Sequence, residues 1–133
     1  MADVERISWE EFRKDVALLA EKIKASGRKY NGLYGIPRGG ALVAVMLSHL
    51  LELPMQKEPT YGDLVVDDIC DSGETCSKYL SYADVACVYY KPHSIIMPTF
   101  YAVEKELNTW IQFPYETKLV DTISKVNYRS DNA

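Results

Sequence analysis

Acidic, hydroxyl and glycine residues follow one another directly after a short apolar run, in the sequence LVVDDICDSGET at positions 64–75. The two β-branched valines of that run are typical of a buried parallel strand. Asp67 and Asp68 then fall near its carboxyl end, where open α/β sheets bind ligands. After Asp71, the hydroxyls, the glycine and the successive N–H groups of 72–75 suit an anion at the start of a helix. The segment predicts a strand that leads into a phosphate-binding loop, although such residues also occur in turns that only cap a helix.

A second loop combines glycines with one cation, in the sequence GIPRGG at positions 35–40. It lies between an expected strand, 30–34, and an expected helix, 41–51, so its amides face the same edge of the sheet as the acidic loop. Arg38 adds a fixed positive charge beside Gly39. Alone, this loop is equally compatible with a glycine-rich turn that leaves Arg38 exposed. Together with the acidic loop, it favours a second anion site.

The remaining elements must hold these loops in place. Ser8 and Glu11 form a capping box, which predicts a helix from there to about Gly27. A short helix is expected near 76–82, a buried strand at 85–90, and weaker strands at 101–103 and 109–113. Strands that alternate with helices indicate an α/β fold with a mainly parallel sheet flanked by helices on both faces.

The segment 64–75 resembles the 5-phosphoribosyl 1-pyrophosphate (PRPP) motif of type I phosphoribosyltransferases. That motif is an apolar strand, two acids, two spacer residues and then Asp-Thr/Ser-Gly-x-Thr. The loop at 35–40 resembles the pyrophosphate loop of the same family, which often has an unusual peptide geometry. The resemblance implies a type I phosphoribosyltransferase-like fold over a single domain, 1–133. It also implies a reaction in which magnesium-bound PRPP loses pyrophosphate as a purine nitrogen attacks the ribose.

The resemblance further implies roles for individual residues toward PRPP. Asp67 and Asp68 would hold the ribose hydroxyls and the Mg²⁺ shell, because Mg²⁺ prefers oxygen ligands. Asp71 would be the general base at the purine ring. The pyrophosphate would bind Arg38 and Gly39, and the 5-phosphate would bind the loop residues Ser72, Gly73, Glu74 and Thr75.

A lysine and a late aromatic segment resemble the purine branch of this family, over a likeness that extends from Ser8 to Glu116. Lys91 follows the expected strand 85–90, and the sequence WIQFPYE covers 110–116. By that resemblance Lys91 donates to the 6-oxygen of guanine, xanthine or hypoxanthine, Trp110 stacks on the ring, and the Ile111 backbone meets the base edge. The alternative is that Trp110 and Phe113 are core aromatics and Lys91 is a solvated strand end.

The chain departs from the family between Pro54 and Leu64, where a strand and a long hood are usual. The short segment here is too short to form a strand and also fold back over a pocket. An uncovered site admits water, which makes catalysis slow unless a neighbouring subunit covers it. The alternative function is therefore a catalytically weak or inactive PRPP- or nucleotide-binding regulatory protein. We expect a homodimer or a higher homo-oligomer.

Composition narrows the remaining classes of function. The formal net charge of −4 and the absence of a dense Lys/Arg block argue against nucleic-acid binding. The apolar stretch 41–51 is too short to span a membrane and no signal-peptide pattern is present, so a cytoplasmic protein with no membrane partner is expected. Three cysteines, Cys70, Cys76 and Cys87, form no Cys-x-x-Cys pair, and we expect them to be small core or turn residues rather than a metal cluster.

Overall fold

Four parallel strands form the main sheet of the computed structural model, which describes residues 3–117. Their order is β2 (Leu33–Gly35), β3 (Leu64–Cys70), β4 (Asp84–Tyr90) and β5 (Phe100–Glu104). β3 pairs with β2 on one side and with β4 on the other, so the acidic strand is internal to the sheet. All four strands run in the same direction, and their carboxyl ends therefore meet at one edge.

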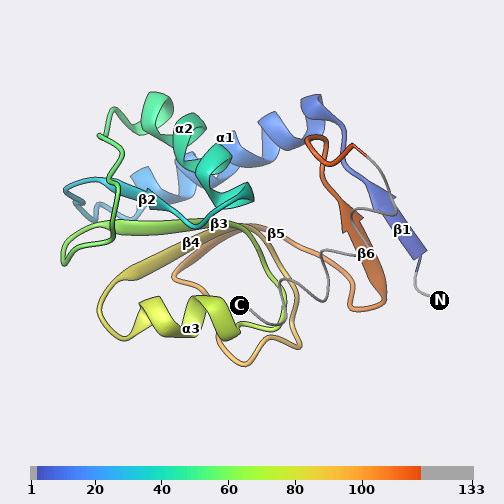
Figure 1. Cartoon of the computed structure of the whole chain (residues 1–133). Coiled ribbons are helices and arrows are strands. Elements are labelled where there is room, and N and C mark those ends of the chain that lie inside the picture. Colours follow the sequence, from blue (N-terminus) through green and yellow to red (C-terminus); the bar gives the residue numbers. More distant parts are fainter. Residues whose placement is uncertain (1–2, 118–133) are drawn as a thin grey trace.

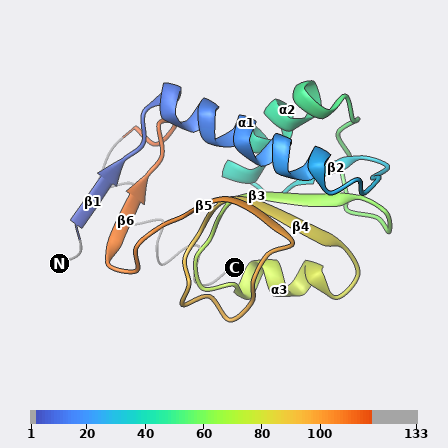
Figure 2. The same ribbon diagram turned by 180° about the vertical axis from the view of Figure 1, so that it is seen from behind.

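Helices cover both faces of this sheet, as the sequence predicts (Figure 1). α1 (Trp9–Ala25) and α2 (Gly39–Leu51) lie on one face, and α3 (Glu74–Leu80) lies on the other, which the reverse view also shows (Figure 2). The β3 side chains alternate accordingly, since Leu64 and Val66 belong to the larger core under α1 and α2 while Val65 belongs to a smaller core under α3.

The capping box at the start of α1 forms as expected, because Ser8 Oγ accepts a hydrogen bond of 3.0 Å from the Glu11 backbone N–H. One apolar stripe of α1 then enters the larger core. Its members follow helical spacing and are fully or almost fully buried: Phe12, Val16, Leu19, Ala20 and Ile23. This helix is the platform on which the late aromatic segment packs, with the ring centroids of Phe12 and Phe113 6.1 Å apart.

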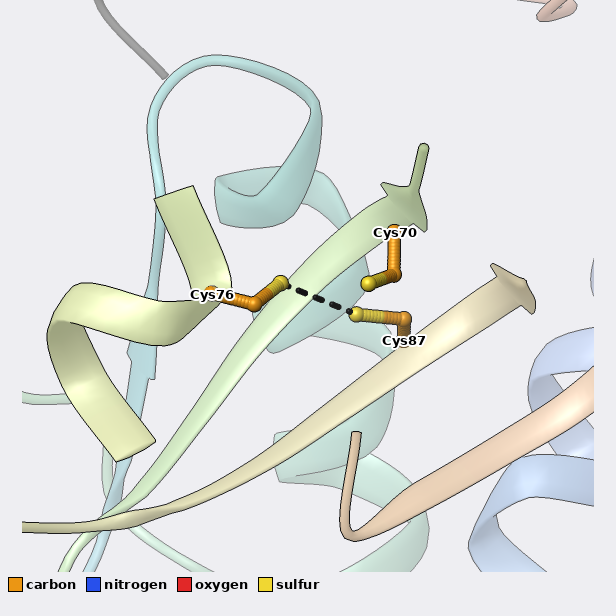
Figure 3. A group of neighbouring side chains, drawn as sticks. All are labelled: Cys70, Cys76 and Cys87. Carbon is orange, nitrogen blue, oxygen red and sulfur yellow. Dashed lines mark hydrogen bonds between the residues drawn. The ribbon is translucent and has the colours of Figure 1, made fainter. Parts of the chain in front are cut away.

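The smaller core contains all three cysteines, which lie together beneath α3 (Figure 3). Cys70 ends β3, Cys76 lies on α3 and Cys87 lies on β4. They are buried core residues, as expected, but the sequence did not indicate that they lie together. The pairing of β3 with β4 and the return of α3 over both strands bring the three thiols to one place.

A separate two-stranded parallel sheet joins the beginning of the described chain to its end. β1 (Asp3–Arg6) pairs with β6 (Thr109–Gln112), with Val4 opposite Trp110 (Figures 1 and 2). β6 was expected, but β1 was not, because the sequence DVER is short, mostly exposed and lacks the alternation that marks a half-buried strand.

Two helices begin two residues earlier than the sequence predicts. α2 begins at Gly39 and α3 at Glu74, so both helices start inside the glycine-containing loops. The segment after Pro54 contains no helix and no strand beyond a single bridge between Met55 and Leu33, as its length predicts. Within residues 3–117, no helix is both long and apolar enough to cross a membrane.

Candidate functional site

Two buried carboxylates occupy the carboxyl half of β3. Asp67 is 8% exposed and Asp68 is 0% exposed. Asp67 Oδ1 accepts a hydrogen bond of 2.8 Å from the Asp68 backbone N–H, and Asp68 Oδ1 accepts one of 2.8 Å from the Ile69 N–H. Asp68 Oδ2 accepts a further hydrogen bond from the Tyr115 hydroxyl. Buried carboxylates need such donors, because an unpaired charge inside a protein is costly.

The glycine-rich loop packs directly on these acids. A Cβ atom on Gly39 would overlap Asp68 Oδ2 and would lie 2.5 Å from the Tyr115 hydroxyl oxygen. The Ile36 N–H donates to the Val66 carbonyl at 2.9 Å, which holds the loop against β3. Arg38 is exposed, and the peptide bond between Pro37 and Arg38 is cis, an unusual geometry of the kind that the resemblance implies. The structure thus places Gly39 against Asp68, with the exposed Arg38 next to it in the loop.

The acidic loop makes a tight turn into α3 at Gly73, whose φ of +87° favours glycine. Ser72 Oγ accepts a hydrogen bond of 3.2 Å from the Glu74 N–H, and both residues are exposed. On its other side the loop is supported by residues 94–95, where the Ile95 N–H donates to the Ser72 carbonyl at 2.9 Å. Thr75 is half-buried in the first turn of α3. The loop therefore has one open side and one supported side.

Asp71 forms an ion-pair contact that sequence reasoning did not foresee. His93 Nε2 lies 2.6 Å from Asp71 Oδ1, and both side chains are about four-tenths exposed, at 43% and 41%. The signal was in the sequence, because His93 follows the strand β4 and strand ends of a parallel sheet share an edge. His49 lies on α2, away from this edge.

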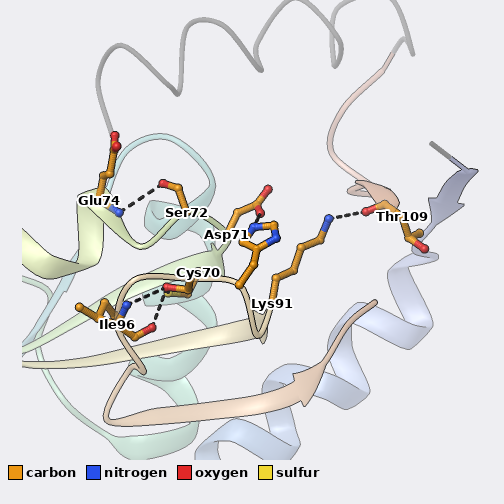
Figure 4. A network of polar contacts seen from close by, with 9 residues as sticks. Cys70, Asp71, Ser72, Glu74, Lys91, Ile96 and Thr109 are labelled. Atoms are coloured by element: carbon orange, nitrogen blue, oxygen red, sulfur yellow. Dashed lines mark hydrogen bonds and ion pairs between the residues drawn. The ribbon is translucent and has the colours of Figure 1, made fainter. Parts of the chain in front are cut away.

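Lys91 is only 3% exposed, so the alternative that it is a solvated strand end is wrong. Its ammonium donates to the Thr109 carbonyl of β6, and its backbone N–H donates to the Cys70 carbonyl at 3.0 Å. Figure 4 shows Asp71 and Lys91 at neighbouring strand ends, with the lysine extended toward Thr109. Lys91 thus connects the main sheet with the two-stranded sheet.

The late aromatic segment divides into core and site residues. Phe113 is 3% exposed and stacks on Tyr115 with ring centroids 5.3 Å apart, so it is a core aromatic. Trp110 is half-buried, and its Nε1 is buried without a hydrogen-bond partner among the described residues. Ile111 is 4% exposed, and within residues 3–117 its strand β6 pairs only with β1 in its sheet. Among the described residues, the other edge of β6 therefore has no strand partner.

No protein-family model matches the chain, but individual proteins and solved structures are similar to it. The xanthine-guanine phosphoribosyltransferase of Gluconobacter oxydans is 29% identical over 140 aligned residues, which cover 84% of this chain and 83% of that protein. The crystal structure of a purine phosphoribosyltransferase from Pyrococcus horikoshii superposes with a TM-score of 0.74 at 25% identity, covering 87% of this chain and 96% of that one.

The chain has the type I phosphoribosyltransferase fold. Its sequence relatives are named phosphoribosyltransferases, a class of pentosyltransferase, so it is a homologue of purine-branch enzymes. A structure from Neisseria gonorrhoeae with bound ppGpp also superposes, with a TM-score of 0.69 at 22% identity over 98% of each chain. In the frame of this phosphoribosyltransferase fold, the two loops and the acids share the carboxyl edge of the sheet.

The hydroxyl of Tyr115 makes a testable contribution to the acidic pair. Replacing Tyr115 with Phe keeps the ring contacts but removes the donor to Asp68, so we expect the free energy of unfolding to fall by about 1.5–3 kcal/mol, as for hydrogen bonds to charged groups. Urea unfolding measures this change. Tyr61→Phe is the matched control, because Tyr61 is 86% exposed. Equal losses in the two variants would show that the Tyr115 hydroxyl does not support Asp68.

Proposed function

We propose that this protein transfers the 5-phosphoribosyl group from PRPP to a 6-oxopurine (guanine, xanthine or hypoxanthine) in the cytoplasm. The products are the nucleoside monophosphate and pyrophosphate. One observation carries the proposal. The two glycine-containing loops adjoin the buried Asp67–Asp68 pair, while the buried Lys91 donates to β6, the strand that contains the half-buried Trp110. The anion-binding groups thus lie apart from the ring-binding groups. The former suit PRPP, which carries phosphate groups at both ends, and the latter suit the flat purine ring.

Different residues would bind the 5-phosphate, the pyrophosphate and the ribose of PRPP. The open side of the acidic loop, with the hydroxyls of Ser72 and Thr75, would take the 5-phosphate. Arg38 and the amide of Gly39 would take the pyrophosphate. Asp67 and Asp68 would hold the ribose hydroxyls, and a ribose hydroxyl would take over the position of the Tyr115 hydroxyl on Asp68.

The same carboxylates fit a magnesium ion, because they offer hard oxygen ligands already oriented by backbone N–H donors. When bound, Mg²⁺ neutralises charge on the pyrophosphate that departs. The carboxylates also stabilise the positive charge that develops on the ribose as the bond to pyrophosphate breaks.

Proton transfer is assigned to Asp71. As the purine nitrogen forms its bond to the ribose anomeric carbon, the proton on the ring passes to the Asp71 carboxylate. His93 contacts Oδ1 of that carboxylate at 2.6 Å and thereby fixes its orientation. We assign His93 a positioning role, because it acts on the base through Asp71.

The base half of the site uses Lys91, Trp110 and Ile111. The Lys91 ammonium would donate to the 6-oxygen while the Thr109 carbonyl holds it in place. The indole of Trp110 would stack on the ring, and its Nε1 offers a donor for which the described residues supply no acceptor. The open edge of β6 would present the Ile111 backbone to the base edge.

A second candidate function is a PRPP- or nucleotide-binding regulator with little or no turnover. The short segment 54–63 favours it, since that segment has no length for a cover over the site. The ppGpp-bound structural neighbour is consistent with a nucleotide ligand on this fold. For the enzyme, we propose that a second copy of the chain supplies the cover.

A turnover assay with PRPP, Mg²⁺ and each purine base separates the two candidates. We expect pyrophosphate and nucleotide in equal amounts with guanine, xanthine or hypoxanthine. Adenine should react poorly, because its 6-amino group donates where Lys91 also donates. PRPP binding without any pyrophosphate release would select the regulator. Efficient use of adenine over the three 6-oxopurines would refute the assignment of Lys91.

Loop geometry can be tested with a matched pair of glycines. Gly73→Val places a side chain against Ser94 and Ile95 at a φ of +87°, and we expect PRPP·Mg²⁺ affinity to fall more than about tenfold. Gly27→Val introduces comparable backbone strain at a φ of +72°, but no atom lies within 4 Å of its Cβ position. Calorimetric titration should therefore show near wild-type affinity for folded Gly27→Val. Equal affinities in both variants would contradict the phosphate-loop assignment.

If Asp71 is the general base, its substitution should lower the catalytic rate without weakening PRPP binding. Asp71→Asn should lower kcat by about 10²–10⁴-fold while PRPP affinity changes little. His93→Gln keeps a side chain that can donate to Asp71, and we expect it to retain more activity than His93→Ala. Steady-state kinetics with calorimetry measures both quantities. Parallel losses of binding and rate in Asp71→Asn would instead make Asp71 a structural residue.

A further inference from the structure

Three thiols meet in the smaller core, although the sequence separates them. Cys70, Cys76 and Cys87 are 1%, 1% and 0% exposed, and their sulfur atoms all lie within 4.8 Å of one another. The Sγ atoms of Cys76 and Cys87 are 3.6 Å apart. Figure 3 shows the three side chains converging from β3, α3 and β4. This cluster lies behind the acidic loop and is not part of the site described above.

The spacing of the sulfur atoms suits a metal ion. A zinc–sulfur bond of about 2.3 Å places two sulfur ligands about 3.8 Å apart in a tetrahedron and about 4.0 Å apart in a trigonal plane. The observed range, from 3.6 Å to no more than 4.8 Å, brackets both values. A cation could therefore bind all three sulfurs after side-chain adjustments of no more than about 1 Å.

The chemistry of the three side chains also suits a cation. Thiolates are the ligands that soft metal ions prefer.

We propose that Cys70, Cys76 and Cys87 form a three-thiolate site for one thiophilic divalent cation of the zinc and cadmium type. As each metal–sulfur bond forms, any proton still on that sulfur passes to the solvent, so apparent affinity rises with pH. Metal binding at this site does not require that the protein be a transferase.

Such an ion would link α3 to the end of β3 and to the middle of β4. Cys70 directly precedes Asp71, and Cys76 directly follows Thr75, so two of the three ligands flank the acidic loop. The ion would therefore restrain the loop from behind without touching its open side. Because the folded chain gathers the ligands, binding should also stabilise the fold.

The probe is Cd²⁺ alone, titrated into the full chain after treatment with a chelator and a thiol reductant. We expect a sulfur-to-cadmium charge-transfer band that saturates at one ion per chain, and the same stoichiometry with Zn²⁺ by native mass spectrometry. X-ray absorption of the zinc-loaded protein should show three sulfur ligands. The melting temperature should rise with added Zn²⁺.

Cys76→Ser should weaken Cd²⁺ affinity more than about 100-fold, beyond the loss typical of a residue that only supports a ligand. Ser77→Ala on the same helix is the matched control and should leave affinity unchanged. Cys70→Ser gives a second test where Cys76→Ser fails to fold. Nitrogen and oxygen ligands alone in the absorption spectrum, or unchanged affinity in both cysteine variants, would overturn the proposal.

Discussion

Burial of two adjacent carboxylates on an internal strand is the constraint on which the rest of the site depends. Asp68 is removed from solvent, so donors must reach it from inside the protein. The backbone of β3 provides one donor and the Tyr115 hydroxyl provides another, which requires the late aromatic segment to fold back over β3. The glycine-rich loop can approach the same carboxylate only because Gly39 has no side chain. Two segments distant in sequence are thus positioned by one pair of acids.

Polar contacts perform a similar function between the main sheet and its neighbours, the small sheet and α1. Lys91 donates to β6, Lys105 Nζ lies 2.8 Å from Glu5 Oε2 on β1, and the Tyr89 hydroxyl donates to Asp15 of α1 at 2.6 Å. Burial and the bond to Asp15 raise the pKa of Tyr89, which keeps its hydroxyl protonated as a donor. The small sheet therefore has a defined position relative to the strand ends, although it shares no strand pairing with the main sheet.

Local patterns in the sequence were sufficient for most of the fold. The valines of β3 and the capping box of α1 each depend on neighbours within a few residues, and the structure has both elements where they were expected. The extra strand β1 could not be predicted, because it depends on pairing with the distant strand β6 and its own four residues have no strand pattern. Lys91 was assigned to the correct edge, but its burial against Thr109 depends on that same long-range pairing.

Sequence reasoning missed two contacts in the site regions, for different reasons. The contact of His93 with Asp71 follows from adjacent strand ends and was accessible in principle from the order of elements. The meeting of the three cysteines was not, because it also depends on how α3 returns across β3 and β4. Residue spacing along the chain carries no information about that return path.

The pairing of β1 with β6 also has a consequence for the order in which the protein can be completed during synthesis. The first described strand finds its partner only after residues 109–112 have left the ribosome. The main sheet, by contrast, forms from consecutive segments between residues 33 and 104. Contacts between distant segments form late, because a long loop must close before they are gained. The side of the site nearest β6 is therefore the last to assemble, and until then β1 is an unpaired strand in the nascent chain.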